Sequence, residues 1–170
     1  SSDLTPVYYP VSAQKNTTSG WWTNFSPYYE LQAGKKIQFK FYNYSDMSAV
    51  WNNWCLAATQ IKREDAGYGA DKEYFVIRND KFGWGANHNA EGFTDDFDWS
   101  GGDDRPNLRK DLNGSLVDMT VSLTAAGVFK MESTITTTTN KVYHYTYTTT
   151  LTAKPSKIVL FFVNEKSYID

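Results

Sequence analysis

Residues 117–147, VDMTVSLTAAGVFKMESTITTTTNKVYHYTY, decide the fold of this chain. Largely apolar residues occupy the odd positions from Val117 to Leu123 and again from Phe129 to Ile135, and polar residues fill the even positions. This alternation is typical of strands that bury one face and expose the other. Ala126-Gly127 predicts a hairpin turn between the two runs. The odd positions from 143 to 147 are all tyrosine, which predicts a further strand with a ring-bearing side.

Strand patterns continue on both sides of this stretch. Ile37 to Phe41 alternates with lysine and glutamine, and Glu73 to Arg78 is short and rich in β-formers. Ile158 to Val163 is apolar throughout, as expected for a strand covered on both faces, and Ser167 to Ile169 fits a last edge strand. The best helical segment, Asn107 to Leu112, is less than two turns long. Many short strands with turn signals predict an all-β, two-sheet antiparallel β-sandwich of the jelly-roll type.

Length and composition narrow the protein class. With 170 residues, the chain predicts one β-sandwich domain spanning 1–170. The 17 Lys and Arg against 19 Asp and Glu give a net charge of −2, which argues against nucleic acid or an anionic membrane as the main partner. No apolar run approaches the ~20 residues of a membrane span. The polar start of the chain indicates that any signal peptide has already been removed, and the single cysteine, Cys55, reads as a buried, unreactive thiol.

The residues contain no recognisable catalytic set, so we expect a protein that is not an enzyme. A glycosidase needs two carboxylates about 5–10 Å apart, and the E-x-D-x-E motif of jelly-roll glucanases is missing. No G-x-S-x-G elbow or zinc-binding spacing accompanies His88 and His144, the two imidazoles. The enzymatic alternative is a small endo-acting glycosidase or polysaccharide lyase. It would need Glu73, Glu91 or Glu132 in one cleft with the tryptophans, and Glu73 could meet Glu132 across a sheet.

Aromatic residues make up 16% of the chain, including 6 tryptophans, and suggest rings left on the surface to bind a ligand. Sugars offer a C–H face on which Trp or Tyr rings stack, and a hydroxyl rim suited to Asn, Asp and Arg side chains. Segments 51–54 (WNNW) and 78–85 (RNDKFGWG) have this composition, and the glycines beside Trp84 are expected to leave its ring uncrowded in a loop. The candidate ligand-binding residues are Trp22, Trp51, Asn53, Trp54, Arg78, Asp80, Trp84, Asn87 and His88.

Several of these residues also have a structural interpretation. Trp54 begins an apolar strand and fits the core as well as a binding face. Arg78 could instead form an ion pair with Asp80 or Asp96. The tyrosines at 143, 145 and 147 could form a second stacking platform or, as is commoner, a cross-strand aromatic ladder.

The order of these segments resembles a known class of protein. GWWTNFS at residues 20–26, Tyr28-Tyr29, Gly34 before a strand, and the 51–54 and 78–85 segments look like the β-sandwich carbohydrate-binding modules of extracellular bacterial polysaccharidases and surface glycan-binding lipoproteins. The resemblance implies a non-catalytic module that binds β-glucan, xyloglucan, xylan or a related polysaccharide. It also implies an extracellular or cell-surface location, with the module tethered to an enzyme or to a lipid anchor. A cell-surface protein-interaction domain is a further alternative, which predicts one flat apolar patch of exposed rings.

Residues 79–116 form the longest poorly patterned region, which is usual for a functional or metal-ordered loop. Asp96 and Asp98 precede Gly101 like the first half of a calcium loop. Asn107 stands at the twelfth position, where an EF-hand loop carries glutamate, so an EF-hand is not expected. A structural calcium held by Asp96 and Asp98 and a solvated acidic loop are the two alternatives, and no other cofactor is expected.

Overall fold

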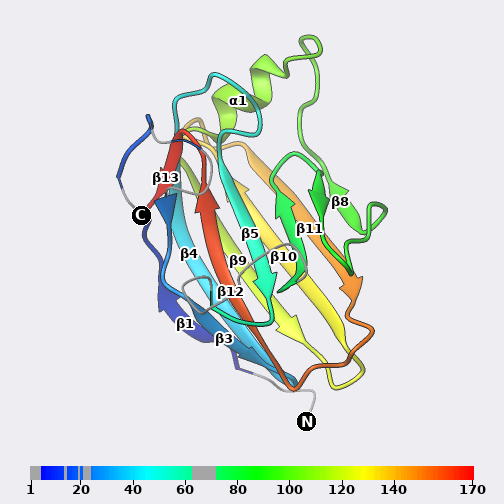
Figure 1. Ribbon diagram of the computed structural model, residues 1–170. Coiled ribbons are helices and arrows are strands. Elements are labelled where there is room, and N and C mark those ends of the chain that lie inside the picture. The colour runs from blue at the N-terminus through cyan, green and yellow to red at the C-terminus, as the bar shows by residue number, and fades with distance from the viewer. Residues whose placement is uncertain (1–4, 14, 19, 21–23, 63–71) are drawn as a thin grey trace.

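The computed structural model describes residues 5–13, 15–18, 20, 24–62 and 72–170, and it is an all-β sandwich (Figure 1). Two mainly antiparallel sheets pack against each other, which confirms the predicted fold class. One sheet has the order β1-β4-β9-β10-β11-β8, with β13 also paired to β4; we call it the seven-stranded sheet. The other has the order β2-β12-β5-β6-β7, with β3 also paired to β12; we call it the six-stranded sheet.

The strands of the seven-stranded sheet are β1 (Val7–Pro10), β4 (Lys35–Ser45), β8 (Phe93–Asp95), β9 (Ser115–Leu123), β10 (Val128–Thr136), β11 (Val142–Thr150) and β13 (Ser167–Ile169). Those of the six-stranded sheet are β2 (Asn24–Phe25), β3 (Tyr29–Gln32), β5 (Trp54–Thr59), β6 (Glu73–Arg78), β7 (Gly83–Trp84) and β12 (Lys157–Asn164). β1 runs parallel to β4, an exception to the expected antiparallel pairing.

The predicted hairpin at 126–127 joins β9 to β10. Phe129 pairs with Leu123 and Ile135 with Val117, so the apolar positions of both strands share the buried face. Gly127 has a φ of +87°, and a Cβ at this position would lie 2.4 Å from the Leu151 carbonyl oxygen. Only glycine fits this turn without strain, because other residues rarely adopt a positive φ.

The tyrosines of β11 lie in the core, as the ladder interpretation predicted, and not on a surface platform. Tyr145 and Tyr147 are fully buried, and Phe93 contacts both rings. The Tyr145 hydroxyl donates to the Arg78 carbonyl oxygen and accepts from the Lys81 N–H at 3.1 Å. The buried ladder therefore holds the loop that follows β6.

The six-stranded sheet is covered on both faces, as predicted for the 158–163 run. Leu160 and Phe162 point into the main core, whereas Phe161 and Val163 join a second buried cluster on the other face. Cys55 belongs to this second cluster and is fully buried, as predicted. Burial raises the pKa of its thiol.

The single helix among the described residues, α1 (Pro106–Leu112), begins one residue before the predicted segment. Leu108 and Leu112 are buried and fix it against the core. No helix in the described part of the chain is both long and apolar enough to cross a membrane.

Candidate functional site

The turn between β6 and β7 holds Arg78 in a fixed orientation. The Arg78 Nε and Nη2 atoms donate to the two carboxylate oxygens of Asp80 at 2.8 and 2.6 Å. The Arg78 backbone N–H donates to the Phe82 carbonyl oxygen at 2.8 Å and closes the turn. The two-point pair is the ion pair with Asp80 that the sequence offered as one interpretation, and it fixes the plane of the guanidinium group.

Two rings lie beside this guanidinium group, and a third follows on β7. The Arg78 Cζ atom is 5.6 Å from the centre of the Trp51 ring and 4.4 Å from that of Phe82. The Phe82 and Trp84 ring centres are 6.3 Å apart. Trp51 is 46% exposed and Phe82 is 53% exposed, while Trp84 is half-buried. We call these four side chains, Trp51, Arg78, Phe82 and Trp84, the aromatic row.

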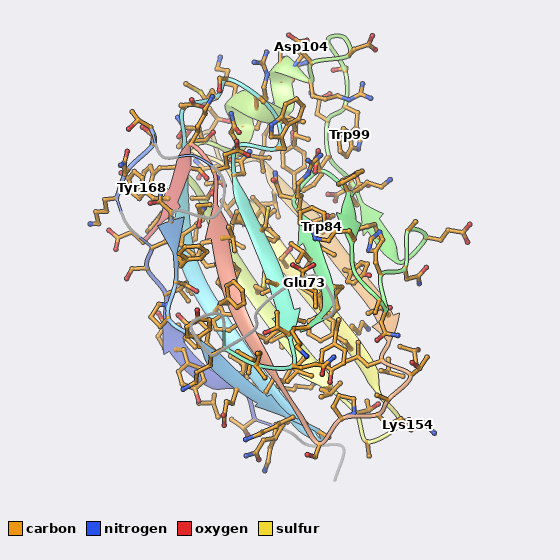
Figure 2. All side chains as sticks on the ribbon, in the orientation of Figure 1. Glu73, Trp84, Trp99, Asp104, Lys154 and Tyr168 are labelled. Atoms are coloured by element: carbon orange, nitrogen blue, oxygen red, sulfur yellow. The ribbon has the colours of Figure 1, made fainter. Side chains whose placement is uncertain are left out.

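Trp84 is anchored more firmly than a loop residue. It lies in β7 and pairs with Val76, and its ring packs against the second buried cluster. Its Nε1–H donates to the Glu73 Oε2 atom at 2.9 Å. The expectation that Trp84 sits in a loop is therefore wrong; a short edge strand presents the ring at the sheet surface (Figure 2).

The glycines beside Trp84 serve a different purpose from the expected one, which was to leave its ring uncrowded. A Cβ at Gly83 would lie 2.4 Å from the Val76 carbonyl oxygen, and one at Gly85 would lie 2.6 Å from the Phe75 Cα atom. Gly85 also has a φ of +122°. The glycines allow β7 to approach β6 closely, and this approach brings Trp84 over the cluster.

Trp99 is a half-buried ring, linked to the turn after β6, that the sequence analysis did not select. Its Nε1–H donates to Asp95 at 2.8 Å, and the Lys81 Nζ atom lies 5.9 Å from its ring centre. Lys81 also forms an ion pair with Asp95 at 3.1 Å. Lys81 therefore links the β6–β7 turn to Trp99.

Phe82 was also not selected by the sequence analysis, although it lies within the 78–85 segment. A single Phe outside an alternating run carries no signal of exposure.

Two predicted ligand contacts belong to the core instead, so their prediction as site residues is wrong. Trp54 is 1% exposed and packs against Phe41 and Phe162. Asn53 is also 1% exposed; its Nδ2 donates to the Val50 carbonyl oxygen. Neither side chain is accessible to a surface ligand. Trp22, the other predicted contact near the start of the chain, lies outside the described residues.

Asn87 and His88 face β11 and not the aromatic row. His88 stacks on Tyr147 with ring centres 6.0 Å apart, and its Nδ1 lies 3.2 Å from the Tyr147 hydroxyl. Burial lowers the pKa of His88. The Asn87 carbonyl oxygen accepts the Thr149 hydroxyl at 2.5 Å. These contacts connect the segment after β7 to the opposite sheet, which is a structural task.

The two aspartates expected to bind calcium have separate partners. Asp96 accepts the His144 backbone N–H at 2.6 Å and contacts the His144 Nδ1 at 2.8 Å. Burial raises the pKa of Asp96, but the hydrogen bonds from His144 outweigh it and leave that pKa below its usual value. Asp98 accepts from Ser100. Among the described residues no three His, Cys, Asp or Glu side chains form a metal-binding group, and the structure does not bring Asp96 and Asp98 together on one partner.

The glutamates that an enzyme would need do not share a site. Glu73 is 5% exposed and bonds to Trp84, and Glu132 lies on the exposed face of the other sheet beside Lys130. Glu73 and Glu132 therefore do not meet across one sheet, as the enzymatic alternative allowed, since they belong to different sheets. Glu91 is exposed in the segment after β7.

Comparison of the chain with models of known families, with curated proteins and with solved structures found no match.

Proposed function

We propose that this chain is a non-catalytic carbohydrate-binding module that binds a neutral polysaccharide of the β-glucan, xyloglucan or xylan type along the aromatic row. The observation that carries the proposal is the fixed guanidinium group of Arg78 beside the half-exposed rings of Trp51 and Phe82. Aromatic rings with a planar hydrogen-bonding group beside them match the C–H face and hydroxyl rim of a sugar.

The row is also ordered before a ligand binds. Asp80 fixes Arg78 by two hydrogen bonds, and Glu73 fixes Trp84 through its indole N–H. Two of the five N–H groups of Arg78 are directed at Asp80, and the remaining groups can donate to sugar hydroxyls. Because little side-chain freedom of the protein is lost on binding, the ordered row lowers the entropic cost of holding a polymer.

The ion pair beside the row also argues against a flat, purely apolar docking patch. The side chains of Arg78 and Asp80 are only 22% and 8% exposed, so Asp80 already neutralises the guanidinium group at the surface. Arg78 thus adds a polar donor among the rings. We further propose that the module acts outside the cell, tethered to an enzyme or to a lipid anchor, where such polymers occur.

Affinity gel electrophoresis against β-glucan, xyloglucan, xylan and mannan tests the proposal. We expect at least one polymer to slow the protein, and no effect from any of them at protein concentrations up to millimolar would contradict it. A parallel assay for reducing ends separates binding from catalysis. Release of reducing sugar would replace the proposal with the endo-acting enzyme, whereas a protein that is slowed without such release supports the module.

A further inference from the structure

A second group of rings, one exposed and two half-buried, lies on the outer face of the seven-stranded sheet. Tyr42 and Tyr44 occupy outward positions of β4, and Tyr168 of β13 pairs directly with Tyr44. The rings of Tyr44 and Tyr168 are stacked with centres 4.9 Å apart, and those of Tyr42 and Tyr44 are 6.5 Å apart. Tyr42 is 47% exposed. We call Tyr42, Tyr44 and Tyr168 the tyrosine platform.

Two hollows border the platform. The first, of about 700 Å³, is lined by Tyr42 together with Tyr8, Lys40 and Asp170 among others. The second, of about 610 Å³, is lined by Tyr44 and by polar groups that include Arg109, Lys110 and Asn113. Each hollow therefore combines a platform ring with groups that donate or accept hydrogen bonds.

The charges around the platform indicate an uncharged ligand. The first hollow contains both Lys40 and Asp170, and Asp170 forms an ion pair with Lys15. In the second hollow Arg109 is paired with Asp104 at 3.1 Å, and Lys110 adds a positive charge. Because Asp170 and Arg109 already have partners of opposite sign, no single sign of charge dominates the surface around the platform. Tyrosine hydroxyls, an amide and charges of both signs instead match a ligand rich in hydroxyl groups. Purely apolar contacts would not require this mixture.

The platform and the aromatic row belong to different sheets. Figure 2 shows Tyr168, on β13, at the left of the view and Trp84, on β7, near its centre. We propose that the tyrosine platform is a second binding face for a neutral polysaccharide, so that one copy of the chain holds two polymer strands and cross-links them. The inference rests on the proposed function for its ligand class, but it uses none of the residues of the row.

Two double variants separate the faces. Tyr44→Ala/Tyr168→Ala removes the platform, and Trp51→Ala/Phe82→Ala removes the exposed rings of the row. Val142→Ala is the matched control, since Val142 is 49% exposed on the same outer face as the platform. Circular dichroism checks that each variant is folded. If the platform double variant unfolds, Tyr42→Ala alone replaces it, because that ring is nearly half exposed.

Affinity electrophoresis in β-glucan, xyloglucan, xylan and mannan gives the readout, with turbidity of protein–polymer mixtures as the measure of cross-linking. We expect each double variant to be slowed less than wild type, the combined variant to migrate freely, and turbidity to appear with wild type and Val142→Ala only. A platform variant that is slowed like wild type and still produces turbidity would overturn the inference. A row variant that behaves like wild type would overturn the proposed site on the row and leave the platform standing. Wild type that is not slowed by any of the polymers would overturn both.

Discussion

The β11 ladder (Tyr143, Tyr145 and Tyr147) and the aromatic row are both rich in rings, yet one is buried and the other exposed. The ladder lies on a nine-residue strand, β11, whose alternate positions all face the opposite sheet. The row takes Trp84 from the two-residue strand β7 and Arg78 from the end of β6. Phe82 and Trp51 come from the turns that precede β7 and β5. The exposure of a ring therefore depends on whether a second layer covers its position and not on the local density of aromatic residues.

The two regions are also connected. The Tyr145 hydroxyl bonds to the backbone of Arg78 and Lys81, the segment that carries the centre of the row. The buried ladder thus positions the exposed row. Substitutions in the ladder should therefore change stability more than binding. Substitutions in the row should change binding more than stability.

The largest expected effect is a loss of stability on removing a buried core ring. Trp54→Ala removes a fully buried ring and should lower the free energy of unfolding by ~3–5 kcal/mol. Chemical denaturation followed by fluorescence measures the loss. Trp51→Ala is the matched control three residues earlier, and it should change stability far less. Equal losses in both variants would show that Trp51 also belongs to the core.

Trp84→Ala should weaken polysaccharide binding and also lower the stability of the fold. Loss of stacking should weaken polysaccharide binding by about 1–3 kcal/mol, by analogy with the stacking of bases on aromatic side chains. Because the ring is half-buried, the stability loss should stay below the ~3–5 kcal/mol of a buried tryptophan. Titration calorimetry and denaturation on the same sample separate the two effects. Unchanged binding, or complete unfolding, would remove Trp84 from the proposed site.

Tyr145→Phe tests the connection between the regions. It keeps the buried ring but removes the hydroxyl that bonds to the Arg78 carbonyl oxygen and the Lys81 N–H. We expect a stability loss of about 1 kcal/mol, with weaker binding, since the turn that carries Arg78 is less fixed. Thermal unfolding and calorimetry provide the measurements. Weaker stability with wild-type affinity would mean that the row does not depend on the ladder.

The smallest expected effect is a pH dependence from His88. Burial lowers the pKa of His88 in the folded protein below its ordinary 6.5, so the unfolded chain binds the proton more readily. Its contribution to stability is therefore present above about pH 6.5 and is lost as the pH falls. The melting temperature of the wild-type protein should fall as the pH is lowered from 7 to 5. The melting temperature of His88→Gln should fall less over the same range. Parallel curves for the two proteins would assign the pH dependence to other groups.

The sequence predicted the elements whose signal is local. Alternation marked both strands of the 117–135 hairpin, and the apolar run at 158–163 marked a strand buried on both faces. The parallel pairing of β1 with β4 left no such signal, because it joins segments that are far apart in the chain. The same limit applies to the site. Trp51 and Trp54 are close in sequence and similar in context, and only the position of the second sheet separates an exposed ring from a buried one.

Binding by the aromatic row itself is tested most directly in the Tyr44→Ala/Tyr168→Ala background, where the row is the only proposed face left. Titration calorimetry with the polymer that slows the wild-type protein most would compare this protein with the same protein carrying Trp51→Ala/Phe82→Ala as well. We predict that the added substitutions weaken binding at least about tenfold, or ~1.4 kcal/mol, with little change in stability. Equal affinity in two folded proteins would contradict the role proposed for the row.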